Sequence, residues 1–345
     1  MNKRFFGKTK AGQDTYLYDI TNGKGMTVTL CDYGALTQAI YVQDKDGRTI
    51  DVALGHDTID GYEDYTGYMG ATVGRVANRI ANARLVIDGV EYQLDQNDNE
   101  NNLHSGINGT AKKVWTVKEE GEDSMTFSII DDGEEGFPGK ALMEVTYQVT
   151  PENGLKISYY GICDHATPFN LTNHSYFNLD GSKTIYEHYL QLNASAYTPD
   201  IDSKSIPTGE IRPVEGTAFD FRIAKTIGQD INQDDEQLAI VGGYDHNFAL
   251  DKTSKEVEYA GALASKTSGI RMEIYTDCPG IQIYSGNFIG GFLGKGGVPY
   301  EKRGGIAMET QYYPNSVNDP AFESPIVAAG QEYRSVTEYR FMIEK

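Results

Sequence analysis

The sequence predicts an all-β fold, a sandwich or a barrel of short strands with few helices. Apolar and polar residues alternate along most of the chain, which is the period of two expected of half-buried strands. The 38 Gly and 11 Pro residues are spread along the chain, so turns are frequent and long helices have little room. The 24 Tyr and 13 Phe residues suit the pleated surface of a sheet. Short strands with turn signals between them are typical of sandwiches and barrels.

Two hairpins are the clearest local predictions. The first spans residues 84–94 and turns at Asp88-Gly89, a dipeptide typical of a tight type I′ turn. The second joins residues 144–150 to 155–161 through Pro-Glu-Asn-Gly. Further alternating runs occupy residues 26–31, 185–194, 271–276, 281–284, 306–310 and 332–343.

Helical patterns are confined to residues 57–62 and to parts of 223–237. No repeat of fixed period, low-complexity tract or linker interrupts the chain. Although a length of 345 residues is compatible with about two domains, all-β chains often run long as one unit. The sequence therefore predicts a single domain covering residues 1–345.

The charge balance excludes several classes of partner. With 50 acidic and 30 basic residues, the formal net charge is −20, which repels nucleic acid and anionic membranes. The same charge disfavours phosphorylated substrates unless a local basic pocket exists. No apolar run approaches the length of a membrane span, so we expect no membrane-spanning segment.

The cysteines indicate a reducing compartment. Cys31, Cys163 and Cys278 are odd in number and none forms a CxxC pair, so neither a disulfide scaffold nor a zinc site of cysteines is predicted. The basic residues 1–8 are not followed by an apolar stretch, so no secretory signal is predicted. We expect a cytoplasmic protein.

A histidine stands in the middle of residues 170–179, which we interpret as one strand. On a strand, Thr172, His174 and Tyr176 share one face. Held among Asn, Thr and Ser residues, His174 can keep one tautomer and exchange a proton near neutral pH. The alternative is a structural, hydrogen-bonded histidine, which is the commoner case for a lone histidine.

Other polar clusters occur before this histidine. Residues 74–80, Gly-Arg-Val-Ala-Asn-Arg-Ile, set two arginines and Asn78 among apolar residues. An arginine there can bind sugar hydroxyls or a carboxylate, or it can form an ion pair that supports a loop. His104 lies in a second polar, turn-rich segment. Residues 131–139 are acidic and glycine-rich but lack the spacing of a calcium loop, so a structural loop is predicted.

Two carboxylates that follow His174 in the sequence are candidates for a functional site. Asp245 and His246 are adjacent, so an extended backbone turns them to opposite faces and only one can face a given pocket. Glu309 is an isolated acid in a short apolar strand, where burial is costly unless the carboxylate has a partner or a function. The histidines show no paired metal-ligand spacing such as HxH or HExxH, so no metal is predicted.

Taken together, these segments resemble the aldose 1-epimerase (galactose mutarotase) family over nearly the whole chain. The similarity runs in order through residues 74–80, 102–106, 113–115, 132–139, 167–179, 243–248, 279–287, 309–318 and 331–341. Small departures are Ser105, Thr110-Ala111 and Tyr312-Tyr313, which we place at pocket edges and which leave the preferred sugar open.

The resemblance implies a large antiparallel β-sandwich (a supersandwich) that binds a monosaccharide and needs no cofactor or metal. It implies an isomerase that interconverts the α and β anomers of free hexoses such as D-galactose and D-glucose. Carried over by motif, Glu309 is the general base and His174 the general acid. The residues expected to bind the sugar hydroxyls are Asp245, Arg79, Asn78, His104 and Gln282.

The chemistry of ring opening agrees with these roles. A base takes the proton of the C1 hydroxyl while an acid protonates the ring oxygen, and the two exchange protons again as the ring closes. A bell-shaped pH profile follows, with an acidic limb expected from Glu309 and a basic limb from His174. The alternatives are a hexose-6-phosphate 1-epimerase, a glycosidase that uses Asp245 and Glu309, and a non-catalytic sugar-binding protein. A monomer and a homodimer both remain open.

Overall fold

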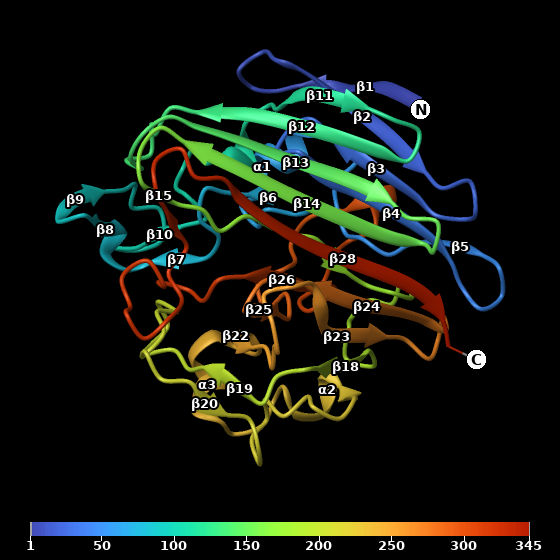
Figure 1. The fold of residues 1–345 in the computed structure, drawn as a ribbon. Helices are drawn as coiled ribbons and strands as arrows, with labels where there is room; N and C mark the ends of the chain where they lie inside the picture. Colours follow the sequence, from blue (N-terminus) through green and yellow to red (C-terminus); the bar gives the residue numbers. More distant parts are fainter. Residues whose placement is uncertain (1, 345) are drawn as a thin grey trace.

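The computed structural model describes residues 2–344, and its regular structure consists mainly of antiparallel strands (Figure 1). Met1 and Lys345, the ends of the predicted domain, lie outside the described residues. Three larger sheets contain nine, six and five strands. The predicted all-β class with few short helices is confirmed.

The nine-stranded sheet contains the longest strands, which run side by side across the middle of Figure 1. Every neighbouring pair in it is antiparallel. In spatial order its strands are β11 (Thr116–Glu120), β12 (Ser124–Asp131), β13 (Ala141–Val149), β14 (Gly154–Cys163), β28 (Tyr333–Ile343), β24 (Ile270–Thr276), β23 (Glu258–Ala264), β18 (Tyr189–Leu192) and β21 (Lys225–Thr226).

The two smaller sheets pack against this long sheet. The five-stranded sheet is a meander of β1 (Asn2–Lys8), β2 (Asp14–Thr21), β3 (Thr27–Cys31), β4 (Leu36–Gln43) and β5 (Thr49–Asp51). The six-stranded sheet has the spatial order β17 (Tyr176–Phe177), β26 (Ile306–Gln311), β25 (Gly280–Tyr284), β22 (Asp245–Ala249), β19 (Ala196–Thr198) and β20 (Arg212–Pro213).

One apolar core joins the three sheets. It contains Val28 and Ile40 of the five-stranded sheet, Val145 of the nine-stranded sheet, and Ile283 and Met308 of the six-stranded sheet. Burying one face of each sheet in this way is the arrangement of a β-sandwich. It leaves the other face of the six-stranded sheet free for polar residues.

Short pairs and helices complete the described residues. The two-stranded pairs are β6 (Thr72–Val73) with β16 (Thr172–Asn173), β7 (Arg79–Ile80) with β10 (Asn102–Leu103), β8 (Arg84–Ile87) with β9 (Val90–Gln93), and β15 (Thr167–Pro168) with β27 (Ile326–Val327). The helices are α1 (Ile59–Asp64), α2 (Ile227–Asp230) and α3 (Glu236–Val241), with 3₁₀ turns at Ala81–Ala83, Thr110–Lys112 and Lys295–Gly297. Across residues 2–344, no helix has the length and apolar character needed to cross a membrane.

Local signals set the predicted turn at Asp88-Gly89 and the bounds of helix α3, which lies mostly beyond residues 223–237, the range predicted to be partly helical. Asp88 and Gly89 both have positive φ angles, 52° and 79°, as a type I′ turn between β8 and β9 requires. Helix α3 begins where the Asp235 carboxylate accepts the backbone N–H groups of Gln237 and Leu238, and it ends at the left-handed Gly242.

The prediction of one strand over residues 170–179 is wrong. The segment contains two short strands, β16 and β17, which pair with different partners, β6 and β26. The cause is local: Asn173 Oδ1 accepts the N–H and the hydroxyl of Ser175 at 3.1 and 2.6 Å, which bends the backbone at His174. Likewise, the run 185–194 forms a strand only at Tyr189–Leu192.

Candidate active site

A cavity of about 260 Å³ opens on the polar face of the six-stranded sheet. The register of β22, β25 and β26 sets its floor, because Gln282 lies directly opposite Glu309 and Asp245 lies opposite Tyr284. All the site residues predicted from the sequence line this one cavity. They are Asn78, Arg79, His104, His174, Asp245, Gln282 and Glu309.

His174 and Glu309 face each other in the cavity, with 3.4 Å between Nε2 and Oε1. Their side chains are only 6% and 3% exposed. Burial lowers the pKa of His174 to about 4, and burial together with the charge of Asp245 raises the pKa of Glu309 well above its usual value. Between the pKa of His174 and that of Glu309 the pair therefore holds one proton, which either group can carry.

His104 presents its Nε2 as a hydrogen-bond donor. Its Nδ1 accepts the backbone N–H of Asn78 at 3.1 Å, while the backbone N–H of His104 donates to the carbonyl of Asn78. Burial lowers the pKa of His104 well below its usual value, so the ring is neutral and its proton is on Nε2. The positive φ of Asn78 and His104, 64° and 51°, brings the ends of β7 and β10 together for this exchange.

The donor set resembles a metal site but does not suit one. Ligand atoms of His104, His174 and Glu309 lie within 4.8 Å of one another, a proximity that sequence spacing did not reveal. To bind a metal, His104 Nε2 must offer its lone pair, so the ring proton must move to Nδ1. There the proton would face the backbone N–H of Asn78, and two donors would oppose each other. Histidine ligands usually donate their second N–H to an acceptor, and here a donor occupies that place.

Arg79 and Asp245 form the charged side of the cavity. Arg79 Nε donates to Asp98 at 2.7 Å, and Gln282 Nε2 donates to Asp245 at 2.8 Å. Burial lowers the pKa of Arg79, but the charges of Asp245 and Asp98 raise it by more. Burial raises the pKa of Asp245, against the opposing effect of Arg79. Asp98, which orients Arg79, was not singled out from the sequence because no local pattern reveals this pairing.

Aromatic side chains that the sequence analysis did not assign form much of the wall. They are Tyr65, Tyr68, Tyr176, Tyr284 and Phe288. The Tyr176 ring lies 5.0 Å from that of His174, and its hydroxyl donates to the Gly67 carbonyl. Tyr176 follows His174 by two residues, and this shared face of the predicted strand was the signal in the sequence that could have placed Tyr176 in the site.

The two arginines of residues 74–80 have different surroundings. Arg75 is fully buried and donates to Asp131, Thr167 and the carbonyls of the 131–139 loop. The ion pair of Arg75 with Asp131 supports this loop, which is one of the two roles left open by the sequence. Arg79, in contrast, lines the cavity. Similarly, Asp245 lines the cavity, and its neighbour His246 packs on the opposite face against Phe219.

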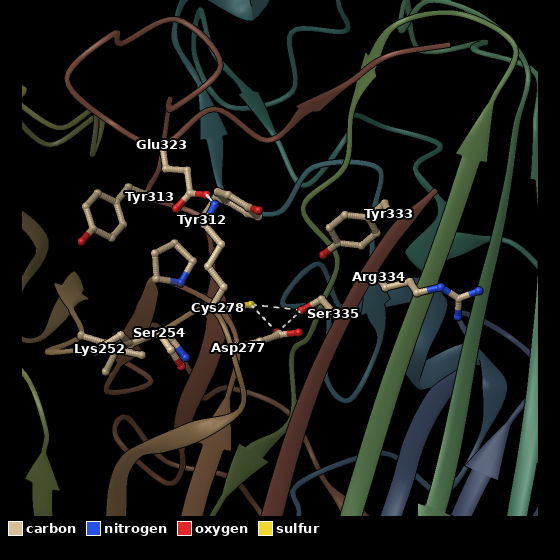
Figure 2. Close-up of a pocket in the computed structure, with 13 residues that line it drawn as sticks. Lys252, Ser254, Asp277, Cys278, Tyr312, Tyr313, Glu323, Tyr333, Arg334 and Ser335 are labelled. Carbon is tan, nitrogen blue, oxygen red and sulfur yellow. Dashed lines mark hydrogen bonds and ion pairs between the residues drawn. The ribbon is translucent and has the colours of Figure 1, made fainter. Parts of the chain in front are cut away.

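The prediction that the departures from the family pattern touch the pocket edges is wrong for this cavity. Ser105 is bonded to the backbone of Val76 behind His104, and the Thr110 hydroxyl donates to the Gly74 carbonyl. Tyr312 and Tyr313 line a second cavity of about 260 Å³ at the far end of β25 and β26 (Figure 2). There they lie near Asp277, Cys278 and Ser335.

Comparison with known proteins identifies the family. A family model for aldose 1-epimerase matches residues 16–340. Galactose mutarotase of Mus musculus is 41% identical over 99% of both chains, and aldose 1-epimerase of Escherichia coli (strain K12) is 38% identical over 96% of this chain and 97% of its own.

Solved structures agree with this assignment. An aldose epimerase homologue from C. elegans covers 96% of this chain and all of its own, with a TM-score of 0.90 and 34% identity. The galactose 1-epimerase from Lactobacillus acidophilus NCFM covers 100% and 99%, with a TM-score of 0.85 and 28% identity. The chain therefore belongs to the aldose 1-epimerase family, and it is an isomerase.

Proposed function

We propose that this isomerase interconverts the α and β anomers of free hexoses, with Glu309 as general base and His174 as general acid. The observation that carries the proposal is the 3.4 Å contact between His174 Nε2 and Glu309 Oε1 inside a cavity lined by hydrogen-bonding side chains. The relatives named galactose mutarotase and aldose 1-epimerase support D-galactose and D-glucose as the substrates to test first.

The shared proton suits a reaction that takes a proton at one sugar oxygen and returns one at another. Glu309 removes the proton of the C1 hydroxyl while His174 protonates the ring oxygen, and the ring opens. Rotation about the C1–C2 bond followed by the reverse transfers closes the ring on the other face. A positioned acid or base typically contributes about 10²–10⁴ in rate.

The remaining polar residues are proposed to bind the sugar. Asp245 and Gln282, already hydrogen-bonded to each other, offer acceptors and a donor to hydroxyl groups. Asn78 is assigned to the same role. The Nε2–H of His104 and the guanidinium of Arg79 are donors for the aldehyde oxygen that forms when the ring opens.

Three alternatives fit the cavity less well. A hexose 6-phosphate needs a basic subsite, yet among the described residues that line the cavity Arg79 is the one cation, and Asp98 already pairs with it. For a glycosidase, Asp245 and Glu309 lie on strands separated by β25, about 10 Å apart at the backbone, and Asp245 is bonded to Gln282. A non-catalytic binding protein has no need of the buried His174–Glu309 contact.

No metal or cofactor is part of the proposal, because the tautomer of His104 opposes metal binding. The buried, free thiols of Cys31, Cys163 and Cys278 support a cytoplasmic location. A monomer or a homodimer is expected.

Polarimetry on freshly dissolved α-D-galactose and α-D-glucose tests the proposal. We expect the purified protein to accelerate the approach to the equilibrium rotation, and overnight treatment with a chelator to leave the rate unchanged. A rate equal to that of buffer alone, with both sugars, would refute the proposed substrates.

A further inference from the structure

The sheet face that carries Glu309 also carries buried polar atoms without a hydrogen-bond partner among residues 2–344. They belong to adjacent strands, and the side chains concerned are at most 4% exposed. The atoms are Thr172 Oγ1, Asn247 Oδ1 and Nδ2, Gln282 Oε1, Glu309 Oε2, and Gln311 Oε1 and Nε2. Native proteins leave few such atoms unpaired, so a cluster of them requires an explanation.

Strand register makes these side chains neighbours. Asn247 lies directly opposite Gln282, and Gln282 lies directly opposite Glu309. Opposite residues have Cβ atoms about 4.5–5.5 Å apart. Gln311 follows Glu309 by two residues on β26, so both point to the same face about 7 Å apart. Strand β16, which carries Thr172, contacts β26 on its other side.

Gly280 has no side chain, which lets the side chains of Asn247 and Tyr313 lie against its backbone. It pairs with Gln311, and a Cβ at Gly280 would lie 2.5 Å from Asn247 Oδ1 and 2.8 Å from the ring of Tyr313. The amide of Asn247 therefore lies over Gly280, beside Gln311, and the Tyr313 ring, which also lines the second cavity (Figure 2), lies against Gly280.

We call the space bounded by Thr172, Asn247, Gly280 and Gln311 the amide chamber. None of these four residues lines the sugar cavity. Gln282 and Glu309 do line that cavity, and each also has one unpaired oxygen that is shielded from solvent. These two residues therefore belong both to the sugar cavity and to the cluster of unpaired atoms.

We propose that the amide chamber holds ordered water that donates hydrogen bonds to Glu309 Oε2 and thereby supports the negative charge of this carboxylate during the reaction. An unpaired buried polar group costs about 1–3 kcal/mol, and water is the usual partner where several such groups surround a space. A water that bridges two groups at about 2.8 Å from each spans at most roughly 5.6 Å, enough to join side chains on strands about 4.8 Å apart. The amide oxygens accept the second proton of each water.

This inference rests on the proposed role of Glu309 and predicts a specific change when the chamber is altered. Other charged or titratable groups that act on Glu309 are His174, Asp245 and Arg79, with Tyr176 and Tyr339 packed nearby. With those unchanged, loss of the water makes the carboxylate harder to charge. Because burial lowers the pKa of His174 and raises that of Glu309, the basic limb of kcat/KM belongs to Glu309 and not, as expected from the sequence, to His174. This limb should then move to higher pH, and kcat should fall.

Two variants test the chamber by different routes. Gln311→Met keeps the length of the side chain but removes its hydrogen-bonding atoms, and Gly280→Ala adds a methyl group that must displace the Asn247 amide and the Tyr313 ring. For each we expect the basic limb to rise by about one pH unit and kcat near pH 7 to fall about tenfold, because one pKa unit corresponds to a factor of ten. KM should stay within about twofold, since neither residue lines the sugar cavity.

Thr310→Val is the matched control. Thr310 is also buried and is adjacent to Glu309, but it points to the opposite face, where its hydroxyl bonds Thr337. We expect this variant to lose stability and to keep the wild-type pH limbs. An unchanged basic limb in Gln311→Met, or the same shift in Thr310→Val, would overturn the inference.

A crystal structure with ordered solvent provides a test that needs no activity. We expect a water within hydrogen-bond distance of Glu309 Oε2 and of at least one chamber amide. A dry chamber, with the amides of Asn247 and Gln311 bonded directly to each other, would overturn the inference. If Glu309→Gln retained full activity while the water was present, the proposed base would fail and the chamber would stand.

Discussion

Burial shifts the pKa values of His174 and Glu309 in opposite directions. An imidazolium and a carboxylate both lose hydration in the cavity, so the neutral form of each group is favoured. The protonated pair loses its first proton from His174, at a pKa of about 4, and its second from Glu309 at a higher pH. This order is the reverse of the one expected from the sequence, which used ordinary values.

The pH profile of kcat/KM should follow this reversed order in the free protein. Below the pKa of His174 both groups are protonated and no base remains, whereas above the pKa of Glu309 both have lost their protons and no acid remains. We therefore expect the acidic limb to lie near pH 4 and to disappear from the residual activity of His174→Asn. Polarimetric kinetics across pH checks this, and persistence of the acidic limb in that variant would assign it to another group.

At the scale of elements, one short segment supplies both a structural and a functional arginine. Arg75 and Arg79 are four residues apart, yet the first is 0% exposed and paired with Asp131, while the second lines the cavity. A residue pattern alone left both roles open for either arginine. The pairing with Asp131, more than fifty residues away, decides the matter for Arg75.

Replacing each arginine by methionine should separate the two roles. Arg75→Met leaves Asp131 buried without its partner, and breaking such a pair costs about 3–5 kcal/mol of unfolding free energy. Arg79→Met should instead raise KM and lower kcat with a smaller loss of stability. Urea denaturation and polarimetry on both variants check this, and a stable Arg75→Met protein would contradict the structural role.

The strands and turns that could be predicted from the sequence are those determined by residues close together in the chain. The Asp88-Gly89 turn and the alternation along β13, β14 and β28 were readable because neighbours in the chain decide them. The break at His174 was missed because it depends on the side chain of Asn173, which competes with strand pairing. The unpaired amides of the chamber, and the pairing of Arg79 with Asp98, depend on contacts that residue order does not encode locally.

At the scale of the whole molecule, buried neutral histidines make the fold sensitive to acid. His246 packs against Tyr197 and Phe219, and burial lowers its pKa to about 3. In the unfolded chain the pKa returns to about 6.5, so below that pH the unfolded state binds a proton that the native state does not. The unfolding free energy therefore decreases as pH falls from about 6.5 toward 3.

His246→Leu should remove this contribution. At pH 5 the histidine costs about 2 kcal/mol of unfolding free energy, so the difference in stability between pH 7.5 and pH 5 should shrink by about that amount. Urea denaturation at the two pH values measures it. The exposed His165 provides a control position in His165→Gln, and an unchanged pH dependence in His246→Leu would contradict the argument.

The most direct test of the proposed mechanism is the polarimetric rate of Glu309→Gln. This change keeps the size of the side chain but removes its ability to accept the anomeric proton, so kcat should fall by about 10²–10⁴ while KM stays near the wild-type value. Asp245→Ala, a change in sugar binding, should instead act mainly by raising KM. A Glu309→Gln protein that is folded by circular dichroism and turns over α-D-galactose at the wild-type rate would contradict the assignment of Glu309 as the base.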